Sequence, residues 1–440
     1  MSIETKFVGV QMKKLGRNVY FFGVGGVSMS GLAVMMKERG YAVGGFDEVE
    51  NDAVKILQQE GICVDFCLNE EHISEADCVI CSSAIKDDNP CKRFAVSCGK
   101  KILTRGELLG MVSDEHEKVI AVAGSHGKTT TTALIFQILQ EAGVNPTLHL
   151  GGFRVENGKN FHLGGKEFFV TEACEYCDNF LHLHPYVSVV TNVEKEHMDY
   201  FKTFSNQLKS FEKFKKQSDF VVEGFEGVVA KRVRHDKNGG LMFSLWAGKE
   251  KIMNVHMKIC EEVNTQNCIY AYLVAKKLGI EDCVIKSAFE NFKGVKTRFE
   301  KVECPHFDTV ICDYAHHPTE LAKAIETAKK IYKKKTLVTI FQPHTFSRTK
   351  NLLDDFVSVF KQLEMPLFFK TYSAREKPED GVDAEKLSKI IKKNNKNAQY
   401  FENFASLFDF LQKLNRKNIV LLFLGAGDLP NILHKNNFLE

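Results

Sequence analysis

The chain of 440 residues is long enough for about three domains, each with its own hydrophobic core. Its 44% hydrophobic and 26% charged residues exclude wholesale disorder, collagen-like repeats and long coiled coils. The 59 basic and 56 acidic side chains give a net charge of +3, which excludes a general binder of nucleic acid or of anionic membranes.

No apolar run reaches the roughly 18 residues that span a bilayer, and residues 1–17 lack the apolar core of a signal peptide. We therefore expect no membrane partner. The 13 cysteines are odd in number and spread along the chain, which is typical of reduced thiols rather than of a disulfide framework. These features predict a soluble, cytoplasmic, multidomain protein.

Short apolar runs alternate with helical patterns along three stretches of the chain, which is typical of βαβ units around mainly parallel sheets. In the first stretch we expect strands at 18–23, 41–46 and 77–81 and a helix at 30–39. In the second we expect strands at 118–124, 167–171 and 186–191 and a helix at 128–141. In the third we expect strands at 308–313, 336–341 and 419–424 and a helix after Pro318.

This pattern predicts an α/β protein of three domains, at 1–107, 108–295 and 296–440. The first and last should be Rossmann-like, and the central one should have a mostly parallel sheet. For residues 224–248 we expect either a small antiparallel excursion or surface loops, and we assign no function to this stretch. The lysine runs at 333–335 and 392–396 are interpreted as solvated surface.

A glycine-rich segment, Gly23-Val-Gly-Gly-Val-Ser-Met-Ser-Gly, follows the first predicted strand and leads into a helix. Its spacing is similar to the dinucleotide fingerprint, although Ser28 takes the third glycine position. Asp47 ends the next strand, where a contact to a ribose is expected. The segment predicts a diphosphate at a helix N-terminus and leaves the nucleotide open.

A second loop, Gly124-Ser-His-Gly-Lys-Thr-Thr, joins a strand to a helix. Its glycines let successive N–H groups point at one anion, Lys128 supplies charge for the β- and γ-phosphates, and the Thr129 hydroxyl suits Mg²⁺. Val122 stands where the full pattern has glycine, so the loop is a shortened variant. It predicts a nucleoside triphosphate site, so the central domain should be a P-loop-type ATPase domain.

Acidic residues should lie near a triphosphate, because Mg²⁺ prefers oxygen ligands. Glu172 follows an apolar strand in the same domain and is a candidate ligand. The segment after Thr191 is either a polar loop or a functional cluster. It groups the polar residues Asn192, Glu194, Glu196, His197 and Asp199. Two nucleotide sites argue against a simple dehydrogenase and suit an enzyme that uses ATP on a substrate carrying a diphosphate.

Two polar clusters follow strands in the last third, Asp313-Tyr-Ala-His-His-Pro-Thr-Glu and Gln342-Pro-His-Thr-Phe-Ser-Arg-Thr. Ligands of open α/β sheets bind at such positions. The adjacent His316 and His317 are not expected to bind zinc, because no H-x₃-H spacing accompanies them. The two C-x₂-C pairs, Cys78/Cys81 and Cys174/Cys177, are interpreted as thiols in or near the core.

Taken in order, these segments resemble the Mur ligase family over essentially the whole chain. The resemblance rests on both glycine loops, both C-terminal clusters, Ser82-Ser-Ala-Ile with Asn89-Pro, Glu172-Ala-Cys-Glu-Tyr, Thr191-Asn-Val-Glu with His197, Tyr372-Ser-Ala-Arg-Glu and Leu424-Gly-Ala-Gly-Asp. It implies a domain for a UDP-linked substrate, a central ATPase domain and a domain for an amino acid.

The resemblance implies ATP-dependent peptide-bond formation in peptidoglycan precursor synthesis. The lactyl carboxylate of UDP-N-acetylmuramate attacks the γ-phosphate to give an acyl phosphate, and the amine of L-alanine then displaces phosphate. The implied cofactors are ATP and Mg²⁺, or Mn²⁺ in its place, and the implied state is a monomer or a homodimer. His316-His317-Pro and the loop containing Met29 favour this activity.

Two alternatives stay open at this point. One is the recycling ligase of the same family, which attaches a whole tripeptide to the same UDP-sugar and generally lacks the Gln342-Pro-His segment. The other is a nucleotide sensor that has lost catalysis, which the intact Lys128, Glu172, His197 and Arg348 argue against.

The resemblance also implies roles for individual residues. UDP-sugar contacts are implied for Gly23, Gly25, Gly26, Ser28, Met29, Ser30, Asp47, Ser82 and Ser83. ATP contacts are implied for Gly124, Ser125, His126, Gly127, Lys128, Thr129, Thr130, Asn264, Asn267, Arg298 and Asp313. Metal ligands are Thr129, Glu172 and His197, and amino-acid contacts are Tyr314, His316, His344 and Arg348. The catalytic set is Lys128, Glu172, His197, His316 and Arg348.

Chemistry explains these residue types. A carboxylate that attacks a triphosphate brings anion to anion, so cations must gather there. The fork of Arg348 suits the alanine carboxylate, and the general base is either His197 or His316. The chain departs from the family pattern at four positions, Val263, Thr297, Thr345 and Glu196, which concern adenine and amino-acid contacts rather than the phosphate loop.

Overall fold

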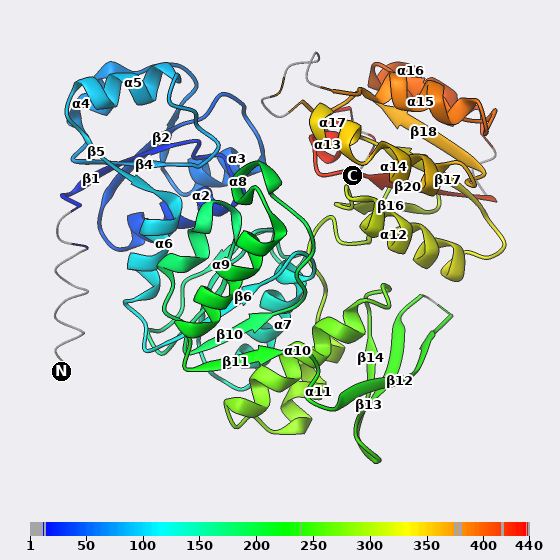
Figure 1. Cartoon of the computed structure of the whole chain (residues 1–440), viewed down its shortest axis with the longest axis horizontal. Helices are drawn as coiled ribbons and strands as arrows, with labels where there is room; N and C mark the ends of the chain where they lie inside the picture. Colours follow the sequence, from blue (N-terminus) through cyan, green and yellow to red (C-terminus); the bar gives the residue numbers. More distant parts are fainter. Residues whose placement is uncertain are drawn as a thin grey trace. The chain divides into compact units, whose positions relative to one another are not determined.

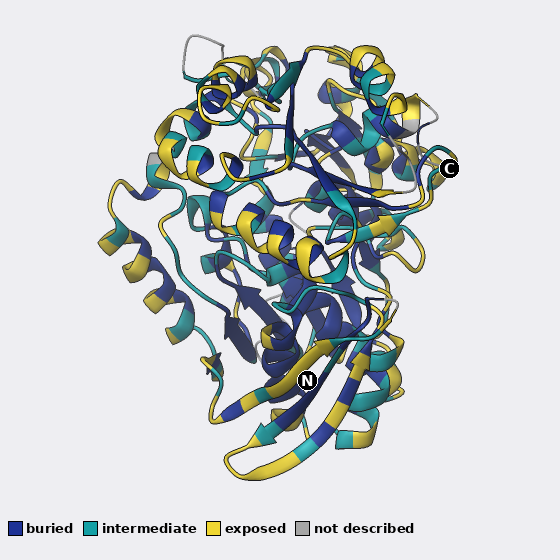
Figure 2. Ribbon diagram, turned by 90° about the vertical axis from the view of Figure 1, so that its right-hand side faces the viewer, coloured by how far each residue is buried: buried dark blue, intermediate teal, exposed yellow. Residues whose placement is uncertain are grey.

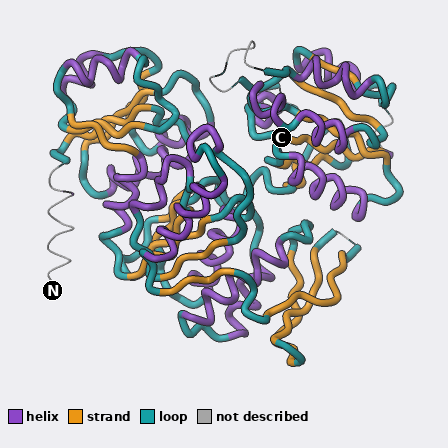
Figure 3. The backbone as a smooth tube through the Cα atoms, in the orientation of Figure 1, coloured by secondary structure: helices purple, strands orange, loops and turns teal. Residues whose placement is uncertain are grey.

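Figure 1 shows a computed structural model of the chain, which describes residues 12, 15–237, 239–373, 376, 381–414, 418–436 and 438. The chain forms two compact units. The first unit comprises Met1–Arg234, Met242–Met257 and Val263–Val295, and the second comprises His235–Leu241, Lys258–Glu262 and Lys296–Glu440. Each unit is described by itself. Both are α/β, as the alternation of strand and helix patterns predicts, and Figure 3 shows helices covering the sheets.

The first sheet of the first unit has five parallel strands in the order β3-β2-β1-β4-β5. Its strands are β1 (Asn18–Phe22), β2 (Ala42–Phe46), β3 (Cys63–Asp65), β4 (Cys78–Cys81) and β5 (Lys101–Thr104). Its helices are α2 (Val27–Glu38), α3 (Asp52–Gln59), α4 (Glu70–Glu75), α5 (Pro90–Ser97) and α6 (Arg105–Ser113). The Rossmann-like prediction is confirmed, and the strand order reverses between β1 and β4, where ligands bind in such sheets.

The helix starts of the first unit are of two kinds. Asn51, Asn69, Asn89 and Thr104 cap α3, α4, α5 and α6 by accepting backbone N–H groups. By contrast, α2 begins after Gly26 and the central helix α7 (Lys128–Glu141) after Gly127, and neither has a side-chain cap. The free N–H groups of α2 and α7 are therefore open to a ligand. Helix α2 also begins at Val27, three residues before the predicted start.

The second sheet of the first unit has six strands in the order β11-β10-β6-β9-β7-β8. The strands are β6 (Lys118–Ala123), β7 (Thr147–His149), β8 (Phe161–His162), β9 (Phe168–Glu172), β10 (Val187–Val190) and β11 (Phe220–Glu223). Only the β7–β8 pair is antiparallel among these strands, so the expected mostly parallel sheet is confirmed. Its helical segments are α7, η1 (Tyr176–His182), α8 (Met198–Phe201), α9 (Phe204–Lys216), α10 (Asn264–Lys277) and α11 (Asp282–Asn291).

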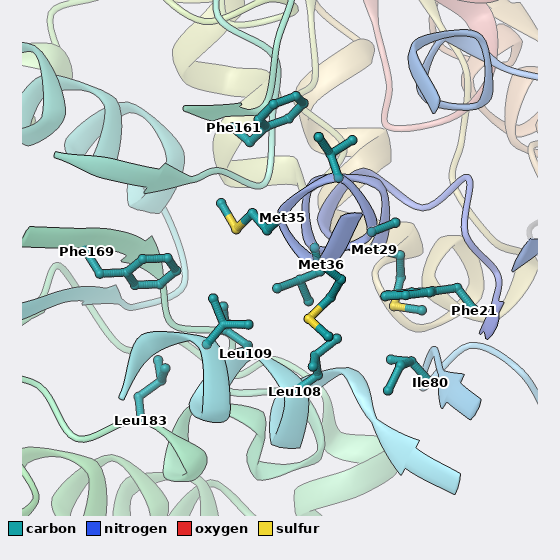
Figure 4. Packing of buried hydrophobic residues seen from close by; sticks show 14 of the residues in the cluster. Phe21, Met29, Met35, Met36, Ile80, Leu108, Leu109, Phe161, Phe169 and Leu183 are labelled. Carbon is teal, nitrogen blue, oxygen red and sulfur yellow. The ribbon is translucent and has the colours of Figure 1, made fainter. Parts of the chain in front are cut away.

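One hydrophobic core joins these two sheets. Figure 4 shows Met36 of α2 and Leu108 of α6 in the same cluster as Phe169 of β9 and Leu183. All four side chains are at most 2% exposed. The predicted domain boundary at residue 107 falls within α6, whose apolar face belongs to this shared core.

Residues 224–248, which predicted either an excursion or loops, contribute to a three-stranded sheet in the order β12-β13-β14. Its strands are β12 (Val228–His235), β13 (Leu241–Ala247) and β14 (Glu250–Met257). Only two residues connect β13 to β14, so these strands run antiparallel. β12 is mostly exposed, whereas β13 is mostly buried, and Figure 2 shows these exposed stretches in contrast with the buried strands of the parallel sheets.

The second unit holds a six-stranded sheet in the order β15-β16-β20-β17-β18-β19. The strands are β15 (Glu300–Val302), β16 (Val310–Asp313), β17 (Thr336–Phe341), β18 (Met365–Phe369), β19 (Gln399–Phe401) and β20 (Ile419–Leu424). The helices are α12 (Pro318–Ile331), α13 (Phe346–Asn351), α14 (Leu353–Phe360), α15 (Ala384–Lys392), α16 (Phe404–Gln412) and α17 (Leu429–Lys435). Among the described residues, no helix combines the length and apolar character that a bilayer crossing requires.

Candidate active site

The phosphate loop between β6 and α7 requires both of its glycines. Gly124 and Gly127 have positive φ values of 127° and 85°, which L side chains rarely adopt. Space is also lacking, since a Cβ on Gly124 would collide with Thr191 and one on Gly127 would lie 2.6 Å from Oδ1 of Asn267. The loop is thus held close to the side chains around it.

The first turn of α7 leaves backbone donors free. The N–H of Thr131 is the first to bond inside the helix, to the carbonyl of Gly127. The N–H groups of Lys128, Thr129 and Thr130 precede it and have no intrahelical acceptor. Together with the helix dipole they form a binding site for an anion.

The side chain of Lys128 pairs with Glu175, a residue for which the sequence predicts no role. Its Nζ lies 3.3 and 3.2 Å from the two carboxylate oxygens of Glu175 and also donates to the carbonyl of Gly124. Glu175 is only 1% exposed. Burial opposes its ionisation, but Lys128 and the neighbouring His197 hold the pKa of Glu175 at about 2. Burial likewise opposes the charge on Lys128, and Glu175 raises the pKa of Lys128 above its ordinary value.

Glu175 also belongs to a cluster of metal-ligating groups. One ligand atom each of Glu175, Glu196 and His197 lies within 4.8 Å of the others, and Nε2 of His197 is 3.6 Å from Oε1 of Glu175. Glu172, the predicted metal ligand at the end of β9, instead accepts the N–H of Gly151 at 2.6 Å. Glu175 lies three residues after Glu172 in the chain, but only the tertiary structure brings it to Lys128.

The segment after Thr191 supports the phosphate loop. Oδ1 of Asn192 accepts the N–H of His126 at 2.9 Å, and the hydroxyl of Thr191 donates to the carbonyl of His126 at 2.6 Å. Nε2 of His126 lies 3.3 Å from Glu194. The segment is therefore a polar loop that contacts the phosphate loop, and a functional role for its side chains stays a prediction. The side chain of Asp199 is outside the described part of the structure.

Two predicted ATP contacts on α10 lie beside the same loop. Asn264 and Asn267 are 3% and 4% exposed. Nδ2 of Asn267 donates to Oδ1 of Asn264 at 2.8 Å, and Oδ1 of Asn267 accepts the Thr131 hydroxyl at 3.3 Å. Val263 occupies the N-cap position of α10, where it offers no side-chain acceptor. The asparagine pair thus fixes the wall against which Gly127 packs.

The N-terminal glycine loop surrounds the free end of α2. Gly23 has a positive φ of 77°, and Oδ2 of Asp47 accepts the N–H of Gly25 at 2.8 Å. Asp47, which the sequence predicts to contact a ribose, therefore also stabilises the glycine loop. Ser82 and Ser83 follow β4, next to the end of β1, and the N–H of Ser82 donates to the carbonyl of Phe22.

Three predicted UDP-sugar residues on α2 have different surroundings. The side chains of Met29 and Ser30 are each 2% exposed, so they face the core and leave only backbone groups for a ligand. The hydroxyl of Ser28 contacts two side chains for which the sequence predicts no role, Nη1 of Arg105 at 3.1 Å and Nε2 of His149 at 3.1 Å. Arg105 therefore adds a positive charge beside the end of α2.

His149 connects the two sheets of the first unit. Its Nε2 lies 3.0 Å from the carbonyl oxygen of Ser28, an acceptor, so Nε2 carries the hydrogen. Its Nδ1 lies 3.1 Å from the hydroxyl oxygen of Thr171, and that hydroxyl donates to the carbonyl of Glu172 at 3.1 Å. Burial lowers the pKa of His149 to about 4, so the ring is neutral at neutral pH.

We expect His149 to make the fold sensitive to acid. An exposed histidine of the unfolded chain takes up a proton near pH 6.5, whereas the folded chain resists until about pH 4, so stability falls as the pH drops between these values. His149→Gln should flatten this slope, because an amide does not titrate. Urea unfolding across this pH range measures the effect, with His182→Gln as an exposed control. An unchanged slope in His149→Gln would contradict the assignment.

The clusters of the second unit flank the central strand β20. Asp313 ends β16 and Phe341 ends β17, and both lie in register with Leu424 of β20. Asp313 accepts the N–H groups of Phe299 and Ala315, each at 2.7 Å. Burial raises the pKa of Asp313 to about 6. The predicted ribose contact therefore also holds together the segment before β15 and the loop after β16.

The predicted amino-acid residues form a chain of rings. Tyr314 and His316 have ring centroids 5.4 Å apart, and His316 and His344 are 5.9 Å apart. Nη1 of Arg348 lies 3.2 Å from Nδ1 of His344. Burial lowers the pKa of His316 to about 4 and that of His344 to about 3, so both rings are neutral at neutral pH.

Two more predicted features adjoin this cluster. Arg298 stacks over the ring of Tyr314 at 4.9 Å. His344 forms a β-bridge with Tyr372, the first residue of the Tyr-Ser-Ala-Arg-Glu segment. Ala374 and Arg375 of that segment lie outside the described residues. The structure thus gathers the four predicted amino-acid residues and places the guanidinium groups of Arg348 and Arg298 beside uncharged rings.

Comparison with known proteins agrees with this architecture. Three family models match, "Mur ligase family, catalytic domain" over residues 18–117, "Mur ligase middle domain" over 122–222 and "Mur ligase, glutamate ligase domain" over 297–427. The fold and the phosphate loop define a nucleotide-binding α/β protein built on parallel sheets. The chain belongs to the Mur ligase family.

Individual relatives match over nearly their whole length. The chain is 35% identical to the UDP-N-acetylmuramate–L-alanine ligase of Caldanaerobacter subterraneus subsp. tengcongensis, covering 98% of this chain and 99% of the relative. It is 36% identical to the enzyme of that name from Caldicellulosiruptor bescii, covering 94% and 97%.

Solved structures share the fold. The UDP-N-acetylmuramate-alanine ligase of Thermotoga maritima superposes with a TM-score of 0.83 at 24% identity, covering 95% of this chain and 97% of that one. A murein peptide ligase of Psychrobacter arcticus gives a TM-score of 0.71 at 20% identity, covering 96% and 98%.

Proposed function

We propose that this chain is an ATP-dependent ligase that joins L-alanine to the lactyl carboxylate of UDP-N-acetylmuramate. The observation that carries the proposal is the phosphate loop, where three free N–H groups and Lys128 adjoin the cluster of Glu175, Glu196 and His197. The two relatives at 35% and 36% identity bear the name of this ligase, which supports it over the tripeptide-recycling alternative.

The chain's own groups account for the first half-reaction. The N-terminus of α7 and Lys128 would bind the β- and γ-phosphates and reduce the repulsion that the attacking carboxylate meets. The substrate carboxylate attacks the γ-phosphorus, ADP leaves, and an acyl phosphate forms. The free end of α2 and Arg105 would hold the diphosphate of the UDP-sugar.

The family implies Mg²⁺, or Mn²⁺ in its place, and the donors present fit a hard cation. Glu175 and Glu196 supply carboxylate oxygens, His197 supplies a nitrogen, and Thr129 and Glu172 are the further predicted oxygen donors. Such an ion would neutralise charge on the triphosphate when bound.

The second half-reaction needs an amino-acid site and a base. Arg348 would hold the alanine carboxylate, and the amine would attack the acyl carbon as phosphate leaves. The base is His197 or His316. Nδ1 of His316 lies 3.0 Å from the carbonyl of Tyr314, so Nδ1 carries the hydrogen and Nε2 keeps a lone pair that can accept a proton.

The proposal includes a cellular setting and a division of labour. We propose a cytoplasmic enzyme of small-molecule substrates, which is supported by the absence of disulfides among the cysteines that the structure describes. Residues 1–107 would bind the UDP-sugar, residues 108–295 ATP, and residues 296–440 the amino acid.

The test is phosphate release with ATP, Mg²⁺ and UDP-N-acetylmuramate. We expect turnover with L-alanine and little with the L-alanyl-γ-D-glutamyl-diaminopimelate tripeptide. Preference for the tripeptide would assign the chain to recycling. Nucleotide binding without turnover on either amine would favour a sensor.

Arg348→Lys should raise KM for L-alanine by about tenfold or more, because an ammonium cannot reproduce the bidentate fork. KM for ATP should stay within about twofold, since the phosphate loop belongs to the first unit. Lys350→Ala, an exposed change on the same helix α13, serves as the control. Initial rates at varied alanine measure the effect, and an unchanged KM for alanine would remove Arg348 from the pocket.

A further inference from the structure

A second group of metal-ligating side chains lies on the edge strand β3 and the helix α4 that follows it. One ligand atom each of Cys63, Asp65 and His72 lies within 4.8 Å of the others. The proposed ligase reaction uses none of the three. Their residue types, a thiol, a carboxylate and an imidazole, are those that bind transition metals.

The local fold explains why these groups meet. Cys63 and Asp65 are two residues apart on β3, so their side chains leave the same face of the strand. His72 is on the short helix α4, whose N-cap Asn69 accepts the His72 N–H at 3.2 Å. The turn between β3 and α4 therefore folds the imidazole back over the end of the strand.

Asp65 is fixed in place by its neighbours. Tyr20 of β1 reaches across β2 because Gly44 has no side chain, and a Cβ there would lie 3.2 Å from the tyrosine ring. The Tyr20 hydroxyl donates to Oδ2 of Asp65 at 2.5 Å, and Nδ2 of Asn69 donates to Oδ1 at 3.2 Å. Hydrogen bonds of this kind orient the carboxylates of metal sites.

The contact between the imidazole and the carboxylate suits a cation. Nδ1 of His72 lies 2.7 Å from Oδ2 of Asp65, which only accepts, so a hydrogen stands between them in the metal-free protein. A metal ion can replace that hydrogen and attract both groups. Cys63 is exposed, so the third ligand is accessible from solvent and an ion can enter.

We propose that Cys63, Asp65 and His72 form a site for Zn²⁺ or a similar borderline transition metal, with water as the fourth ligand. One thiolate, one imidazole and one carboxylate match the donors of tetrahedral zinc, whereas the sulfur disfavours Mg²⁺. On binding, the thiol and the imidazole release their protons to solvent.

Cobalt(II) serves as the probe in a titration of the full chain without nucleotide. We expect near-ultraviolet thiolate-to-cobalt absorption that saturates at one ion per chain and is displaced by Zn²⁺. Cys63→Ser should abolish this band, while Cys98→Ser, which removes another exposed thiol of the same sheet region, should retain it. His72→Gln should weaken cobalt binding by about tenfold or more.

Thermal unfolding with and without Zn²⁺ provides a second measurement. Zn²⁺ should raise the melting temperature of the unmodified chain and of Cys98→Ser but not that of Cys63→Ser. Absence of the cobalt band in the unmodified chain, or its persistence in Cys63→Ser, would overturn the site. Phosphate release in Mg²⁺ tests the ligase separately, so the two proposals can fail independently.

Discussion

Lys128→Ala is expected to reduce phosphate release by at least about 1,000-fold while UDP-sugar binding changes less than about twofold. The lysine is the cation of the phosphate loop, and its removal leaves the attacking carboxylate to meet an unscreened triphosphate. The glycine loop before α2 has its own free N–H groups and does not depend on Lys128. Steady-state assays and calorimetric titration of UDP-N-acetylmuramate measure the two effects.

A double variant separates catalysis from folding. Removing Lys128 alone leaves the buried carboxylate of Glu175 without its partner, which should cost about 3–5 kcal/mol of unfolding free energy. Lys128→Ala combined with Glu175→Gln should recover much of that stability without recovering turnover. If the single variant, still folded, lost UDP-sugar binding as well, the two loops would not be independent.

Glu175→Gln is expected to lower kcat by about 100-fold with little change in KM for alanine. Glu175 positions Lys128 and His197, and an amide of the same shape lacks the charge that holds them. Glu175→Asp should retain more activity than Glu175→Gln because the charge remains. Glu212→Gln, an exposed change on α9, is the matched control. Equal kcat in Glu175→Gln and the unmodified chain would show a purely structural carboxylate.

The same substitution has a pH signature in stability. The folded pKa of Glu175 is depressed to about 2 from an ordinary 4.5, so its contribution is present above pH 4.5 and is lost as the pH falls toward 2. Glu175→Gln should therefore be less stable than the unmodified chain at neutral pH, and the gap should narrow in acid. Urea unfolding at both ends of this range checks the sign.

The phosphate loop could be predicted from sequence because its requirements are local. Glycines 124 and 127 are needed for backbone angles, and the start of α7 at Lys128 follows from them. Strands β17 and β20 were predicted to the residue, since continuous apolar runs mark buried parallel strands. The short edge strand β3 was not predicted, because three half-exposed residues carry no apolar pattern.

The rest of the site depends on contacts between distant residues. Glu175 and Arg105 become candidate site residues only through their contacts with Lys128 and Ser28. These partners lie 47 and 77 positions away in the chain. Met29 shows the reverse, since a residue within a binding loop turns its side chain into the core. Helix α2 is apolar on most of its circumference. The spacing of apolar residues in the sequence therefore does not predict which of its faces points toward the core.

The packing of Met36, Leu108 and Phe169 in a single cluster has a practical consequence for dissecting this enzyme. Cutting the polypeptide near residue 107 would strip both fragments of apolar contacts that they share, so neither piece should fold stably when it is expressed alone. The region from residue 296 onward has core clusters of its own. Chimeras that exchange amino-acid preference should therefore be spliced near residue 295 and should keep His235–Leu241 and Lys258–Glu262 matched to the second unit, because Cys260 packs against its core.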